Sequence, residues 1–126
     1  MKVLTGKQII ELQKHLIDRY GGIHGIRDKG ILDSALNAPF QTFSGIELYP
    51  DIIEKAARLG YGLIKGHAFI DGNKRIGTHA MLIFLLLNDI ELVYSDDDLI
   101  KMILDVAAGT ADCKELSEWI ITHKKQ

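Results

Sequence analysis

Residues 67–79, HAFIDGNKRIGTH, hold more potentially reactive side chains than any other stretch of the chain. Two imidazoles, a carboxylate, an amide and two cations lie there among glycines, and the apolar segment of residues 80–87 follows. Glycine just before an apolar helical pattern indicates a loop that leads into a helix N-terminus, where free backbone N–H groups bind anions. The two cations would add positive charge, so the stretch predicts a phosphate-binding loop.

Each polar side chain of this stretch has a chemical role and a structural alternative. His67 could take a proton from an attacking hydroxyl, the usual role of an imidazole in general base catalysis, although a lone histidine is more often structural. Asp71 either supplies a hard oxygen ligand suited to Mg²⁺ or caps the helix. Asn73 either hydrogen-bonds a phosphate oxygen or braces the loop. Lys74 and Arg75 would contact phosphate, and solvent exposure is the alternative for one of them.

The remaining residues of the stretch support this site and exclude two others. Phe69 is most simply a core anchor that fixes the loop, and His79 lies four residues after Arg75, where it could support the site. Gly72 and Gly77 have the spacing of a P-loop, but a Lys-Ser/Thr pair does not follow them. The two histidines have neither the compact spacing nor the cysteine partners of a zinc site.

Length and composition favour a single cytoplasmic domain spanning residues 1–126. Fifteen basic against seventeen acidic residues give a net charge of -2, which argues against nucleic acid as a direct partner. The single cysteine, Cys113, excludes an intramolecular disulfide framework and is more typical of a packed apolar residue than of a nucleophile. The N-terminus lacks a signal-peptide core, and the longest apolar run is too short to span a membrane, so we expect no membrane association.

Hydrophobic periodicity predicts an all-α fold. Capping and termination signals place helices at residues 5–20, 28–39, 50–66, 73–87, 95–109 and 112–123, with Pro50 as the first residue of its helix. The helix of residues 73–87 is apolar on nearly every side from Ala80 onward, which favours a central position. Residues 39–49 break the helical pattern at Ser44-Gly45 and predict an ordered loop or a small hairpin.

Three further features have a functional and a structural interpretation. Aromatic residues of the segment 39–49, such as Phe43, either hold a partner protein or pin the segment to the body of the protein. Residues 96–98, three consecutive aspartates, resemble a metal cluster but are also favoured in the first turn of a helix, which is the preferred interpretation. Trp119 is interpreted as a packing residue of the last helix.

The pattern HxFxDGNKR at residues 67–75 resembles the signature of the Fic/Doc family, in its Doc (death-on-curing) form with lysine after asparagine. Further similarity to the family lies in RYGG at residues 19–22, in SA at residues 34–35 and in Pro39. The likeness therefore covers nearly the whole chain. It implies a compact helical bundle around a central apolar helix, in which residues 39–49 form a flap that positions a target polypeptide.

The resemblance also implies a role for each motif residue. In the family, the histidine deprotonates a side-chain hydroxyl of a target protein, the acidic residue holds the metal, and the glycine–asparagine segment cradles nucleotide phosphates. These roles transfer to His67, Asp71, Gly72, Asn73 and Arg75, and they imply ATP and Mg²⁺ as cofactors. Lys65 could assist at the site.

Two departures from AMP-transferring members indicate a different reaction. Those members have glycine after the asparagine and a second arginine three residues after the first, where this chain has Lys74 and Thr78. Both departures match Doc members, which bind ATP reversed and present its γ-phosphate. The resemblance thus implies a kinase that phosphorylates a Ser or Thr hydroxyl, for Doc a threonine of elongation factor Tu, and arrests translation.

The resemblance also bears on regulation. Many family members restrain themselves with an [S/T]xxxE[G/N] motif, which this chain lacks. We therefore expect a toxin of a toxin–antitoxin module that is neutralised in trans by a Phd-like antitoxin. The alternatives are AMP transfer to a protein hydroxyl by the same residues and a non-catalytic binding module of the same fold.

Overall fold

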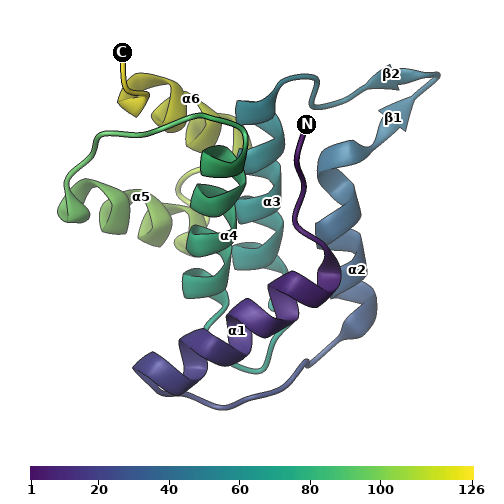
Figure 1. The fold of residues 1–126 in the computed structure, drawn as a ribbon, viewed down its shortest axis with the longest axis vertical. Coiled ribbons are helices and arrows are strands. Elements are labelled where there is room, and N and C mark those ends of the chain that lie inside the picture. The colour runs from purple at the N-terminus through teal and green to yellow at the C-terminus, as the bar shows by residue number, and fades with distance from the viewer.

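The computed structural model describes all residues, 1–126, and shows a bundle of six α-helices with one short hairpin (Figure 1). In chain order the elements are α1 (Gly6–Tyr20), α2 (Lys29–Asn37), the 3₁₀ turn η1 (Ala38–Phe40), β1 (Thr42–Phe43), β2 (Ile46–Glu47), α3 (Ile52–Gly66), α4 (Asn73–Leu87), α5 (Asp96–Ala108) and α6 (Cys113–His123). The expected all-α fold is confirmed. None of the helices combines the length and the apolar character needed to cross a membrane.

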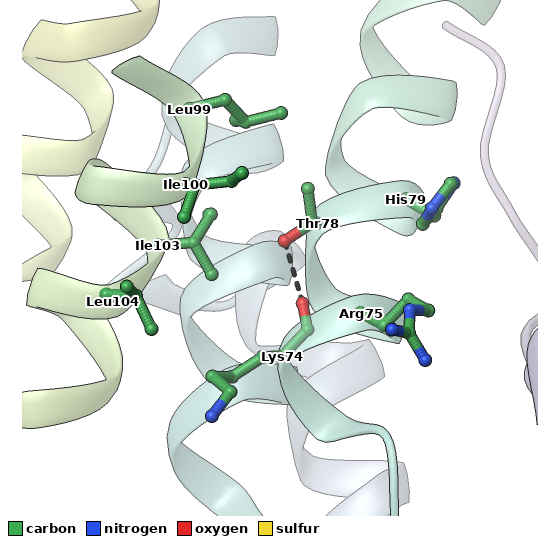
Figure 2. A pocket seen from close by; sticks show the side chains of 8 residues that line it. All are labelled: Lys74, Arg75, Thr78, His79, Leu99, Ile100, Ile103 and Leu104. Carbon is green, nitrogen blue, oxygen red and sulfur yellow. Dashed lines mark hydrogen bonds between the residues drawn. The ribbon is translucent and has the colours of Figure 1, made fainter. Parts of the chain in front are cut away.

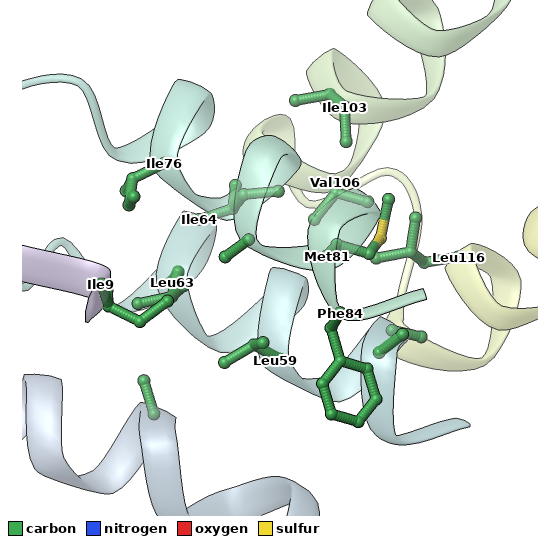
Figure 3. Close-up of a cluster of buried hydrophobic side chains, with 14 of the residues drawn as sticks. Ile9, Leu59, Leu63, Ile64, Ile76, Met81, Phe84, Ile103, Val106 and Leu116 are labelled. Carbon is green, nitrogen blue, oxygen red and sulfur yellow. The ribbon is translucent and has the colours of Figure 1, made fainter. Parts of the chain in front are cut away.

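Helices α3 and α4 form the centre of the bundle. They pack side by side, joined by residues 67–72, and the other four helices lie around them (Figure 1). Buried apolar side chains from all six helices make one hydrophobic core, and Figure 3 shows part of it around Phe84 and Met81 of α4. The apolar helix is central, as expected, although Leu86 and Leu87 near its C-terminus are exposed.

Side-chain caps explain where most helices begin. In five of the six α-helices, the N-cap side chain accepts a hydrogen bond from the backbone N–H three residues later. These N-cap residues are Thr5, Asp28, Asp51, Ser95 and Asp112. The prediction that Pro50 is the first residue of its helix is wrong, because Asp51 accepts from the N–H of Glu54 and so sets the N-cap after the proline. Helix α4 alone has no side-chain cap.

Residues 41–48 form a hairpin, which we name the flap. Its strands pair antiparallel with Phe43 opposite Ile46, and the N–H of Leu48 donates to the carbonyl of Gln41 at 3.0 Å. The expected hairpin is therefore confirmed. Phe43 and Ile46 are 74% and 72% exposed, so the alternative in which the aromatic residues pin this segment to the body is wrong for Phe43.

The C-terminal helices follow the structural interpretations made from the sequence. The three aspartates at residues 96–98 occupy the first turn of α5, where the helix dipole favours negative charge. Trp119 packs against the hydrophobic core and stacks on His123, with 4.1 Å between the ring centroids. Its interpretation as a packing residue is therefore confirmed.

Candidate functional site

The stretch expected to bind phosphate lies where α3 ends and α4 begins. Residues 67–72 form the connection, which we name the motif loop, and residues 73–75 begin α4. A cavity of about 420 Å³, the motif cavity, lies against this stretch. It is lined by His67, Ile70, Asp71, Gly72, Asn73, Lys74 and Arg75. All of these except Ile70 are site residues predicted from the sequence.

His67 caps the C-terminus of α3 in the left-handed conformation, with a φ of 53°. Arg27 holds this helix end: its Nε donates to the carbonyl of His67 at 2.6 Å and its Nη2 to the carbonyl of Gly66 at 3.2 Å. Carbonyl groups at a helix C-terminus otherwise lack partners within the helix. The backbone of His67 is thus held in place while its exposed side chain lines the motif cavity.

The segment before α2 pairs with the motif loop along its edge. The N–H of Arg27 donates to the carbonyl of Ala68 at 2.8 Å, and the N–H of Ile70 donates to the carbonyl of Gly25 at 3.0 Å. Between these bonds, Phe69 is buried in the hydrophobic core. The structure therefore places Phe69 where an anchor of the motif loop is expected to lie.

The side chain of Asn73 braces the motif loop from inside. Its Oδ1 accepts from the N–H of Phe69 at 3.1 Å, and its Nδ2 donates to the carbonyl of Phe69 at 3.0 Å. Both bonds are buried. Of the two roles considered for Asn73, the structure contains the brace, which leaves the second proton of Nδ2 and the backbone N–H for a ligand.

Asp71 ties the motif loop to the segment that follows α1. Its Oδ1 accepts from the N–H of Gly72 at 2.8 Å and its Oδ2 from the N–H of Ile23 at 3.1 Å. The backbone carbonyl of Asp71 accepts from Nε2 of Gln13, a side chain only 2% exposed, at 2.6 Å. The alternative in which Asp71 caps α4 is wrong, because the N-cap residue is Gly72.

The carboxylate of Asp71 fits a magnesium ion that also binds substrate phosphate. No group of three or more His, Cys, Asp or Glu side chains converges in this chain to form a closed metal site. Each oxygen of Asp71 accepts one backbone N–H and keeps a lone pair. Mg²⁺ usually takes one or two carboxylates and completes its shell with water and substrate phosphates, so a single carboxylate beside an anion site suffices.

The N-terminus of α4 is open to an anion. Gly72 has a φ of 71°, a left-handed conformation that glycine adopts without strain, and it provides no side-chain cap. The N–H of Ile76 makes the first helical bond, to the carbonyl of Gly72 at 2.9 Å. The N–H groups of residues 73–75 precede that bond and lie at the positive end of the helix dipole.

The two cations of the motif reach different neighbours. The guanidinium of Arg75 lies over the ring of Tyr20, 4.5 Å from its centroid. Figure 2 shows Lys74 and Thr78 on the side of α4 that faces α5, and Arg75 with His79 on the other side. The hydroxyl of Thr78 donates to the carbonyl of Lys74 at 2.7 Å. These four residues and four apolar residues of α5 line a second cavity of about 330 Å³.

The two residues expected to support the site lie outside the motif cavity. His79 lines the second cavity and not the motif cavity, and burial and the neighbouring Arg75 lower its pKa. Lys65 lines neither cavity. Its Nζ lies beside Gly109 at the end of α5, 3.6 Å from where a Cβ of that residue would be. The structure therefore does not bring Lys65 to the motif cavity.

Comparison with known proteins identifies the family. The chain matches the Fic/DOC family over residues 3–85, which is more than half of its length. The chain belongs to the Fic/Doc family. A relative named toxin Doc, from Mycolicibacterium smegmatis, is 38% identical over 95 residues, covering 75% of this chain and 72% of the relative. The protein kinase doc of Escherichia phage P1 is 26% identical over 118 residues, covering 94% of this chain and 92% of the relative.

The Fic/Doc match contains the complete motif cavity and three residues that sequence reasoning did not assign to it. Gln13 and Arg27 each bond to a backbone carbonyl of the motif loop, and Tyr20 lies against Arg75. The RYGG similarity at residues 19–22 was the available signal for Tyr20. Nothing in the local pattern of Gln13 or Arg27 indicates these contacts, because their partners are about 40 residues or more away in the sequence.

Proposed function

We propose that this Fic/Doc protein is the toxin of a toxin–antitoxin module and transfers the γ-phosphoryl group of ATP to a Ser or Thr hydroxyl of a target protein. The observation that carries the proposal is the uncapped N-terminus of α4, whose first residues line one cavity together with Asp71 and the exposed His67. Phosphoryl transfer needs mainly positioning and charge neutralisation, which such a helix end can provide. The name of the phage relative, a protein kinase, supports the same reaction.

In this proposal, backbone and side chains of the motif share the binding of ATP. The free N–H groups of residues 73–75 hold phosphate oxygens, and Lys74 and Arg75 neutralise their charge. The contact with the ring of Tyr20 would restrict the orientations of the Arg75 guanidinium. Asp71 would hold Mg²⁺, which, when bound, neutralises charge on the phosphate oxygens.

His67 is the proposed general base. Its ring takes the proton of the target hydroxyl as the hydroxyl oxygen bonds to the γ-phosphorus. The bond between the γ-phosphorus and the oxygen that bridges to the β-phosphate breaks, and ADP leaves with that electron pair. Because the side chain of His67 is exposed, the proton can pass from the ring to solvent after transfer.

Two residues favour transfer of the γ-phosphoryl group over transfer of AMP. Lys74 occupies the position that is glycine in AMP-transferring members, and its side chain would obstruct the nucleotide orientation that AMP transfer needs. Thr78 occupies the position of their second arginine, and its hydroxyl is engaged with the carbonyl of Lys74. AMP transfer is the competing reaction, and labelled ATP distinguishes the two.

The proposed partners are a target protein and an antitoxin. The exposed flap presents a short strand edge to which an extended segment of the target could add by backbone pairing. Elongation factor Tu is the proposed target. A Phd-like antitoxin is the proposed inhibitor in trans, and the similarity to toxin Doc supports an antitoxin partner. Co-expression with the product of a neighbouring antitoxin gene should relieve growth arrest; failure to do so would count against this regulation.

Labelled ATP tests the reaction. Purified elongation factor Tu and a cytosolic extract are incubated with Mg²⁺ and ATP that carries label on the α- or the γ-phosphate. We compare the wild type with His67→Ala and with His24→Ala, which removes an exposed histidine paired with Asp18 outside the cavity. We expect transfer of γ-label only, lost in His67→Ala and retained in His24→Ala. Transfer of α-label would indicate AMP transfer, and no transfer by folded protein would favour a non-catalytic module.

A further inference from the structure

Lys55 of α3 is a lysine inside the bundle. Its side chain is 2% exposed although it ends in an ammonium group. Its Nζ donates to Oε1 of Glu47 at 3.0 Å and to the backbone carbonyl of Tyr49, and it lies 5.9 Å from the ring centroid of Phe40. Lysine is almost never buried without such partners, because removing an ammonium group from water is costly. All three partners belong to the flap or to the residues that flank it.

The flap has few other attachments to the body of the protein. The four residues of its strands are exposed, and the bond from Leu48 to Gln41 closes the hairpin onto itself. Beyond its end, the ring of Tyr49 lies 5.9 Å from the guanidinium of Arg58, which is a weaker contact. Lys55 is therefore the point at which charged and polar contacts join the flap to α3.

We propose that Lys55 is the positioning residue that sets the flap relative to the motif cavity. Helix α3 carries Lys55 near its start and His67 at its C-cap, so one rigid element connects the attachment of the flap to the proposed base. The separation of twelve residues corresponds to about 18 Å along a helix. The consequence for catalysis rests on the proposed function, because a target strand held by the flap must present its hydroxyl to His67.

Three variants separate this role from a general effect on stability. Lys55→Met removes the charge and keeps a side chain of similar length, while Glu47, 52% exposed, stays in contact with water. Glu47→Gln keeps a hydrogen-bond acceptor but leaves the buried ammonium without its counter-ion. Lys101→Met is the matched control, because Lys101 pairs with Asp105 at the same 3.0 Å but is 78% exposed on α5.

Hydrogen exchange of the flap amides tests the attachment without any assay of activity. Lys55→Met should speed exchange at the N–H of Leu48 by about tenfold. Leu48 lies between Glu47 and Tyr49, the two residues whose oxygens Lys55 holds, and hydrogen bonds to a charged group contribute free energy of this order to keeping this end of the hairpin closed. Glu47→Gln should speed exchange by about threefold, since the bond to Tyr49 remains, and Lys101→Met should leave it unchanged. Unchanged exchange in Lys55→Met would overturn the proposal. If Lys55→Met does not fold, Glu47→Gln decides in the same way.

Phosphorylation of purified elongation factor Tu tests the consequence for catalysis. Lys55→Met should lower kcat/KM for the protein substrate by about fivefold, while KM for ATP stays within about twofold of the wild type. An unchanged kcat/KM for the protein substrate, or an equal rise in KM for ATP, would contradict a positioning role. If the wild type transfers no phosphate, the proposed function fails, and the exchange experiment still decides whether Lys55 holds the flap.

Discussion

Removal of the Asn73 amide tests whether this side chain braces the motif loop. Asn73→Ala leaves the buried N–H and carbonyl of Phe69 without their partners at 3.1 and 3.0 Å. Each buried group left without a hydrogen bond costs about 1–3 kcal/mol, so the two together cost about 2–6 kcal/mol. Because the loop borders a cavity that admits water, we expect the lower part of this range, a loss of about 3 kcal/mol.

Thermal and urea unfolding, followed by circular dichroism, measure this loss. About 3 kcal/mol should lower Tm by about 10 °C in a domain of this size. Asn73→Asp should be no more stable than Asn73→Ala, since it places a carboxylate oxygen against the carbonyl of Phe69. The matched control is Asn88→Ala at the other end of α4, where the amide bonds to Lys2 and Phe84 in more exposed surroundings. We expect it to cost about 1 kcal/mol.

One outcome would refute the bracing role of Asn73. If Asn73→Ala unfolded at nearly the wild-type temperature but no longer bound ATP, the amide would act on phosphate, and the bonds to Phe69 would be incidental. Calorimetric titration with ATP and Mg²⁺, performed well below the Tm of the variant, provides the second measurement.

Three further predictions concern the surroundings of the motif loop. Tyr20→Leu should weaken ATP binding about two- to fivefold in calorimetric titrations, because a cation–π contact contributes about 0.5–1 kcal/mol to the orientation of Arg75; unchanged affinity would contradict this role. Gly22→Ala places a Cβ 2.8 Å from the carboxylate of the motif aspartate and should raise the Mg²⁺ concentration needed for transfer. Gly21→Ala is the control: it strains the backbone in the same way, but its Cβ has no atom within 4 Å, so it should leave the required Mg²⁺ concentration unchanged. Burial and Arg75 lower the pKa of His79, so the folded chain binds fewer protons there than the unfolded chain, and stability should fall as the pH drops below about 6.5. Urea unfolding at about pH 7 and pH 5 should show a smaller decline for His79→Gln; an equal decline would assign it to other groups.

Local sequence signals predicted the helices well because the interactions that delimit them are local. Thr5 and Gln8 form the expected capping box, and Gly109 ends α5 in the left-handed conformation. The predicted start of α3 was wrong because proline and aspartate are both common at a helix start. Only the hydrogen bond from the N–H of Glu54 to Asp51 decides between them.

The candidate site was less predictable because contacts that form only in the folded motif loop decide between the roles of its residues. The spacing of the motif placed Asn73 and Asp71 at a helix start, but bracing and ligand binding require the same side chains. The decision depends on the bonds to Phe69 for Asn73 and, for Asp71, on Gly72, which occupies the N-cap position of α4. Lys55 gave no signal at all, since a lysine in an amphipathic helix is expected to face water.

The central claim is that residues of the motif cavity transfer the γ-phosphoryl group of ATP to a protein hydroxyl. The most direct test is intact-mass spectrometry of elongation factor Tu after incubation with this protein, ATP and Mg²⁺. We predict that the target gains the mass of one phosphoryl group on a Ser or Thr and gains nothing with His67→Ala. A gain of one AMP group would contradict the proposed orientation of ATP, and an undiminished gain with His67→Ala would contradict the role of His67 as the base.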